Sequence, residues 1–138
     1  MTKKKLICRI SNGFGNQMFM YATAYSFAKQ LNYTLFLDTF SGINQDIKKT
    51  VKKGFKHYKP QYELSVFNIT ANLLTKNLTF DSFFGYLKRN FFIFLDKFTL
   101  KKRFIIENKD SSKKTFYDNS YLNNKFNSKI YVEGYFES

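Results

Sequence analysis

The first third of the chain combines two hydrophobic periodicities. Lys5–Ile10 is a short apolar run typical of a buried strand, and Tyr33–Leu37 is a second such run that ends at Asp38. Between them, from Gln17 to Leu31, apolar positions recur every three or four residues, as in a helix. A strand, a helix and a strand in this order predict a βαβ unit, and therefore a parallel sheet with right-handed crossovers. The expected fold class is α/β, with a Rossmann-like parallel sheet flanked by helices.

The pattern is weaker in the rest of the chain. Thr39–Pro60 is polar and rich in lysine, and it carries two glycines and the only proline, so it predicts a long surface loop. Tyr62–Ile69 is expected to be a short ordered segment. Two further strands are predicted at Arg103–Glu107 and Lys129–Glu133, separated by a polar loop.

Phe80–Leu100 has a dense aromatic pattern at helical spacing. Its apolar centre is bracketed by charged residues such as Lys88 and Asp96, which lie too close together to allow a membrane span. A buried amphipathic helix is the prediction, and a helix lying on a membrane surface is the alternative.

A glycine loop joins the first strand to the first helix. It is part of Ile10–Phe19, where Gly13 and Gly15 are followed at once by the amides Asn16 and Gln17. Such a loop brings backbone N–H groups and carboxamides to a helix N-terminus, where an anionic or polyhydroxylated ligand can bind. The structural alternative is a tight turn whose amides only cap the helix.

Known nucleotide motifs match this loop poorly. The dinucleotide fingerprint needs a third small residue where the chain has Met18, and no P-loop is present. Asp38 does lie at the end of the second strand, where a ribose-binding acid belongs. A small dinucleotide-binding Rossmann domain therefore stays an alternative.

Composition adds a strong positive charge to this picture. The 138 residues include 23 Lys and Arg against 10 acids, a formal net charge of +13, which suits an anionic partner such as a nucleotide, a nucleic acid or a lipid surface. Lysine pairs such as Lys48-Lys49 and Lys52-Lys53 allow a basic nucleic-acid-binding module as an alternative. Because no nucleic-acid-binding motif accompanies them, no specific nucleic-acid partner is expected.

Catalytic and metal-binding residues are scarce. Cys8 and His57 are the only residues of their types, so the sequence predicts no disulfide framework and no metal site, and the catalytic residues stay unknown. The N-terminus lacks the apolar core of an export signal. We expect a cytoplasmic protein, with at most peripheral association at the inner face of the membrane.

Three segments resemble the bacterial α-1,2-fucosyltransferases, glycosyltransferase family 11. The glycine loop and helix start Ile10–Ala22, with Leu37-Asp38 after it, resembles the opening of that family. Tyr62–Ile69 resembles its Tyr-Glu-Leu-x-x-Phe segment, and Tyr131–Ser138 resembles its Gly-Tyr-aromatic-Gln-Ser segment. The order and spacing of the three segments also agree with the family.

The resemblance implies a GT-B-like pair of Rossmann-like domains, of which residues 1–138 would be the N-terminal, acceptor-side half. Family members transfer fucose from GDP-fucose to the 2-hydroxyl of a galactoside-containing glycan, with inversion and without a metal or other cofactor. By resemblance, a set of loop residues and one strand-end acid would bind substrate: Gly13, Phe14, Gly15, Asn16, Gln17 and Asp38.

One family segment is not found in this sequence. Its pattern is His-x-Arg-Arg-x-Asp, and its arginines neutralise the diphosphate of the donor, whereas none of the three arginines here has an arginine neighbour. The resemblance thus implies that the C-terminal GDP-fucose-binding domain is absent and that the fragment has little activity alone. Weak binding of GDP-fucose in calorimetry is the expected result.

Overall fold

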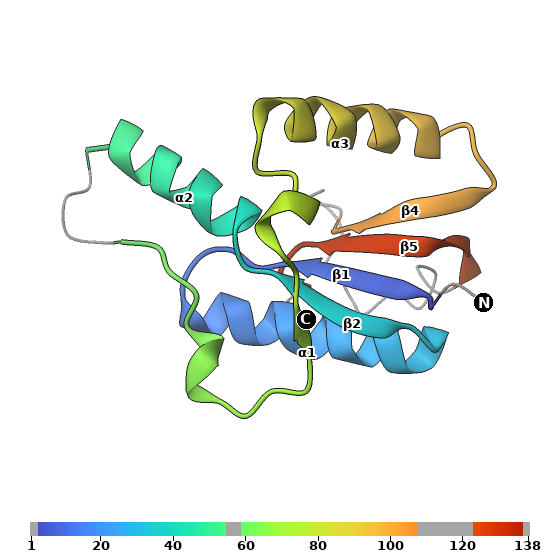
Figure 1. Ribbon diagram of the computed structural model, residues 1–138, viewed down its shortest axis with the longest axis horizontal. Coiled ribbons are helices and arrows are strands. Elements are labelled where there is room, and N and C mark those ends of the chain that lie inside the picture. The colour runs from blue at the N-terminus through green and yellow to red at the C-terminus, as the bar shows by residue number, and fades with distance from the viewer. Residues whose placement is uncertain (1–2, 55–58, 108–122, 137–138) are drawn as a thin grey trace, which may run out of the picture.

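The computed structural model describes residues 3–54, 59–107 and 123–136, so His57 and the last two residues of the third resembling segment lie outside it. Its centre is a five-stranded, fully parallel sheet with the strand order β3-β2-β1-β5-β4 (Figure 1). The strands are β1 (Lys5–Arg9), β2 (Thr34–Asp38), β3 (Asn72–Leu73), β4 (Lys101–Ile106) and β5 (Lys125–Glu133). The prediction of an α/β fold with a Rossmann-like parallel sheet is confirmed.

The predicted βαβ unit is present at the start of the chain. Helix α1 (Phe14–Leu31) joins β1 to β2, and these two strands pair in parallel from Lys5 opposite Thr34. The helix begins at Phe14 rather than at Gln17, because Gly13 serves as its N-cap and the Gln17 N–H donates to the Gly13 carbonyl at 3.0 Å. Half of the glycine loop therefore belongs to the first helical turn.

The sheet divides the interior into two clusters. Alternate β1 residues point to opposite faces, so Leu6 and Cys8 pack with α1 in the larger cluster, while Ile7 joins Tyr131 in the smaller one. In Figure 1, α1 covers one face of the sheet and α3 (Phe83–Asp96) lies on the other side. Burial raises the pKa of Tyr131 to about 12.

The predicted surface loop after β2 is wrong, because helix α2 (Ser41–Lys52) occupies most of it. Ile43 is buried and Ile47 is partly buried, which gives the helix one apolar contact per turn. Gly42 lies so close to the end of β1 that a Cβ built on it would be 2.0 Å from the Ile10 carbonyl oxygen. A close approach and two apolar residues are enough to dock an otherwise polar, lysine-rich helix.

Helix α3 lies where the aromatic pattern predicted a helix, but it is not buried. Among its residues only Asp96 is buried, and this carboxylate accepts the backbone N–H groups of Arg103 and Phe104 at 2.6 and 2.9 Å. The correction has a physical cause: α3 is held to the sheet by polar side chains such as Arg89, so most of its aromatic rings face outward. Among the described residues, no helix is long and apolar enough to cross a membrane.

The predicted strands near residues 103 and 129 are both present, and each starts earlier than expected. β4 and β5 pair in parallel with a register irregularity between Lys102 and Phe104. Two short 3-10 helices, η1 (Leu64–Val66) and η2 (Lys76–Leu78), complete the described elements. The ordered segment predicted at Tyr62–Ile69 thus contains η1, whose Leu64 is buried in the larger cluster.

Candidate functional site

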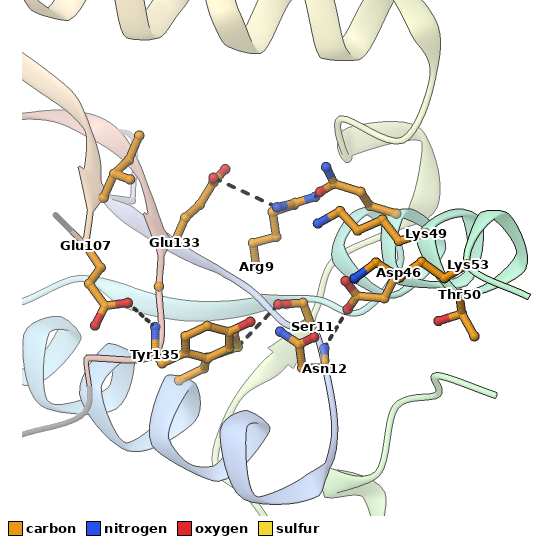
Figure 2. A pocket seen from close by; sticks show the side chains of 14 residues that line it. Arg9, Ser11, Asn12, Asp46, Lys49, Thr50, Lys53, Glu107, Glu133 and Tyr135 are labelled. Atoms are coloured by element: carbon orange, nitrogen blue, oxygen red, sulfur yellow. Dashed lines mark hydrogen bonds and ion pairs between the residues drawn. The ribbon is translucent and has the colours of Figure 1, made fainter. Parts of the chain in front are cut away.

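A crevice opens at the carboxyl ends of β1 and β5. The strand order reverses there, since β2 and β3 lie to one side of β1 while β5 and β4 lie to the other. In open parallel sheets this switch point is where ligands bind. The crevice has a volume of about 480 Å³, within the usual range for small-molecule sites. Side chains from β1, α2, β5 and the loops after the strands line it (Figure 2).

Asn12, rather than a glycine, makes the sharp turn of the glycine loop. Its φ of 59° is left-handed, a conformation that asparagine tolerates better than most residues. Its N–H donates to the Asp46 carboxylate at 2.6 Å, a bond seen in Figure 2. Helix α2 thereby fixes the loop at the mouth of the crevice, where Ser11 and Asn12 form part of the wall.

Gln17, predicted to bind substrate, has a fully buried side chain that bonds to the chain itself. Its Nε2 donates to the carbonyls of Asn12 and Gln61, both at 2.7 Å, and its Oε1 accepts the Glu63 N–H at 2.9 Å. No side-chain cap is formed at the start of α1. The amide of Gln17 therefore fixes two segments to each other, and its hydrogen-bonding groups are occupied by the chain.

Four other predicted loop residues lie beside the crevice and outside its lining. Phe14 is 39% exposed and stacks on Phe67 with ring centroids 5.6 Å apart. A Cβ built on Gly15 would meet nothing within 4 Å, so the first turn of α1 is open to an approaching molecule. Gly13 and Asn16 are both half-buried. Substrate binding by these four residues stays a prediction.

Asp38 holds the start of α2. Its carboxylate accepts the backbone N–H groups of Phe40 and Ser41, at 3.0 and 2.9 Å, and the Ser41 hydroxyl, and only 3% of the residue is exposed. These donors occupy the oxygens that a ribose would need. A binding role for Asp38 stays a prediction that this arrangement does not favour.

Two arginines converge on Glu133 at the end of β5. The Arg89 side chain from α3 binds both carboxylate oxygens of Glu133, with Nε at 2.8 Å. The Arg9 guanidinium lies 4.0 Å from the same carboxylate (Figure 2). The hydrogen bond to Glu133 raises the pKa of Arg89. Arg9 also donates from Nε to the Ser41 hydroxyl at 3.1 Å, so one cluster connects β1, β5, α2 and α3.

The three carboxylates of the crevice differ in how many of their oxygens accept a hydrogen bond from the chain. Glu133 is bound by Arg89 through both oxygens, and Glu107 accepts the N–H groups of Tyr135 and Phe136 at 2.8 and 2.9 Å. Asp46 accepts the Asn12 N–H on Oδ2, and no donor among the described residues lies on Oδ1. Asp46 is 9% exposed, and its Oδ1 is the one carboxylate oxygen in the described lining that no described donor binds.

The crevice also carries positive charge that is not paired within the described chain. Lys49 and Lys53 of α2 and its C-cap line the wall and are exposed, and neither forms an ion pair with a described acid. Sequence reasoning missed Asp46 as a site residue because it took α2 for a loop. The spacing of Ile43 and Ile47 was the signal that could have revealed the helix.

No family model, curated protein or solved structure matches this chain. The geometry alone therefore defines what the crevice can do. It offers one carboxylate oxygen that no described donor binds, two lysine ammonium groups and polar backbone around a small-molecule volume, which suits a polyhydroxylated or anionic ligand.

Nucleophilic attack by a thiol and metal binding both have little support in the described residues. Burial, with the negative charges of Asp38 and Glu133, raises the pKa of the Cys8 thiol far above its usual value, so this thiol stays protonated and is a poor nucleophile. The described residues hold no cluster of three His, Cys, Asp or Glu side chains that could bind a metal ion.

Proposed function

We propose that this chain is the acceptor-side domain of an α-1,2-fucosyltransferase and that its crevice holds a galactoside. One observation carries the proposal: two of the segments that resemble the family, far apart in the sequence, line the crevice together, and the remaining segment contacts the glycine loop. The glycine loop binds the second segment through Gln17 and Glu63, and it shares the crevice wall with Gly134 and Tyr135 of the third.

The contacts between the segments are specific. Gln17 bonds to the backbone on either side of Tyr62, and Phe14 stacks on Phe67 at the far end of the second segment. The third segment begins in the last part of β5, the strand that pairs in parallel with β1. Phe136 packs edge-on against Phe27 of α1, with ring centroids 5.8 Å apart. These contacts join the glycine loop to the second segment, and they join β1 and α1 to the third.

In this proposal Asp46 is the general base of the transfer. Its Oδ1 takes the proton of the galactoside 2-hydroxyl while that oxygen attacks C1 of fucose on the face opposite GDP. The bond from C1 to the β-phosphate oxygen breaks, and GDP leaves with the electron pair. Lys49 and Lys53 face the same crevice and lower the cost of the negative charge that develops on the leaving group.

Galactoside binding is the direct test, and it requires no donor. Methyl β-galactoside is added to the labelled chain, and amide shifts are followed by NMR, with methyl β-glucoside as the stereochemical control. We expect shifts at the crevice amides, foremost Ser11, Asn12 and Gly134, with galactoside only. Equal shifts with both sugars, or shifts confined to other surfaces, would contradict the proposal.

Asp46→Asn sharpens this test, because an asparagine oxygen can still accept the Asn12 N–H while the negative charge is lost. We expect galactoside affinity to fall about tenfold, the loss of one charge-assisted hydrogen bond. Methyl 2-deoxy-β-galactoside lacks the hydroxyl in question, so the wild type and the variant should bind it equally well. Asp81→Asn is the matched control, since Asp81 accepts a bond from Asn44 outside the crevice.

A further inference from the structure

The outward side of α3 is an exposed aromatic stripe. Phe83, Leu87, Phe91, Phe94 and Phe98 recur every three or four residues, which places them along one side of the helix and its C-terminal turn. They are 72%, 48%, 57%, 54% and 74% exposed, and Leu100 extends the stripe at 88%. No described part of the chain covers this stripe, and an apolar patch so continuous marks an interaction surface.

Positive charge borders the stripe on both sides. At about 100° per residue, Lys88 lies on one edge of the stripe and Lys97 on the other. Lys101, the first residue of β4, is also exposed. The only acid of α3 is Asp96, which is buried beneath the helix and bound to Arg103 at 3.2 Å. The outward side of α3 therefore carries aromatic rings and lysines without a negative charge.

We propose that α3 binds the surface of an anionic lipid membrane, lying in the plane of the headgroups with the aromatic stripe inserted. A helix with phenylalanine on one face and lysine at its edges is the pattern of interfacial helices. Among the possible partners of this surface, an anionic bilayer complements both the aromatic stripe and the lysines. Its acyl chains would surround the inserted rings, and its headgroups would pair with the lysines. The net charge of +13 attracts the whole chain to such a surface.

Flotation with lipid vesicles tests this proposal. The full chain is mixed with vesicles of phosphatidylcholine alone, or of equal parts phosphatidylcholine and phosphatidylglycerol, at low and at high salt. We expect the chain to float with the anionic vesicles and to be released in large part by high salt. Failure to float with anionic vesicles, or equal binding to both compositions at every salt concentration, would overturn the proposal.

Paired variants distinguish lipid binding by the aromatic stripe from nonspecific binding by other exposed apolar residues. Phe94→Ser with Phe98→Ser should lower partitioning onto anionic vesicles at least about tenfold, since two large apolar groups no longer insert. Val51→Ser with Val66→Ser is the matched control, because both valines are 74% exposed and lie away from α3, and it should bind like the wild type. All four positions are exposed, so circular dichroism should show unchanged folding.

Charge variants and self-association complete the design. Lys88→Gln with Lys97→Gln should weaken binding to anionic vesicles several-fold, whereas Lys29→Gln with Lys52→Gln, exposed lysines of α1 and α2, should change it less. Sedimentation equilibrium without lipid examines the competing occupant. Dimers that dissociate on Phe94→Ser with Phe98→Ser, in a chain that does not float, would identify a second copy as the partner and overturn the proposal.

Discussion

Gln17 joins the glycine loop to the segment before η1 through three hydrogen bonds of one side chain. Because the Gln17 side chain is fully buried, these bonds satisfy an amide that water does not reach. Loss of the amide would remove one partner each from the Asn12 and Gln61 carbonyls and from the Glu63 N–H. Gln17 is thus a positioning residue for the crevice wall.

Gln17→Met tests this role, because methionine has a similar length and no hydrogen-bonding amide. We expect the free energy of unfolding, measured by urea denaturation, to fall by about 3 kcal/mol. Gln30→Met makes the same change at an exposed position of the same helix and should cost less than about 0.5 kcal/mol. Equal losses in the two variants would show that the Gln17 bonds contribute nothing beyond helix propensity.

At the scale of elements, α2 can pack closely against the end of β1 because Gly42 has no side chain. Gly42→Ala would place a methyl group 2.0 Å from the Ile10 carbonyl oxygen, so the helix or the end of β1 must move. We expect a loss of about 2 kcal/mol in the free energy of unfolding, the usual cost of overpacking, together with weaker galactoside binding because Asp46 moves with α2. Thermal and urea unfolding, with the NMR titration, measure both effects.

Gly15→Ala is the matched control for Gly42→Ala. Gly15 lies in the first turn of α1 with open space around its missing Cβ, so alanine should stabilise the chain by up to about 1 kcal/mol. The same variant examines the sequence-based expectation that the loop contacts substrate, since the added methyl group would obstruct a ligand there. A Gly42→Ala variant as stable as Gly15→Ala would contradict the docking argument.

The elements also show how far the sequence could be interpreted. β1, α1 and β2 were predictable because each carries its own hydrophobic period. Helix α2 was not, because Gly42 and a single apolar contact per turn dock it, and Asp46 was missed with it. The position of α3 was predictable, but its exposure was not. An aromatic pattern at helical spacing is the same whether the rings pack in the protein core or lie on its surface.

The role of Gln17 was unpredictable for a related reason. An amide beside two glycines looks like a ligand-binding group, and only the return of the chain at Gln61 and Glu63 occupies it from within. Asp38 behaves in the same way, because α2 supplies its donors. In both cases, contacts distant in the sequence decide whether a polar side chain faces a ligand or the chain.

At the scale of the whole molecule, the two proposed surfaces lie at different places on the sheet. Helix α3 runs along one side of the sheet (Figure 1). The crevice lies at the carboxyl ends of β1 and β5, and the aromatic stripe of α3 is exposed. No residue of α3 lines the crevice. Arg89 connects them directly, because its side chain reaches from α3 to Glu133 at the crevice wall.

This separation makes a prediction about independence. Because the stripe and the crevice share no residue, Phe94→Ser with Phe98→Ser should leave the galactoside-induced amide shifts unchanged, and Asp46→Asn should leave vesicle flotation unchanged. The combined variant should show both losses at the sizes seen separately, since distant sites without shared partners behave additively. Arg89→Met is the informative exception: it leaves the carboxylate of Glu133 without its main partner, so we expect it to weaken galactoside binding. A change in the flotation of the wild type when methyl β-galactoside is added would contradict this independence.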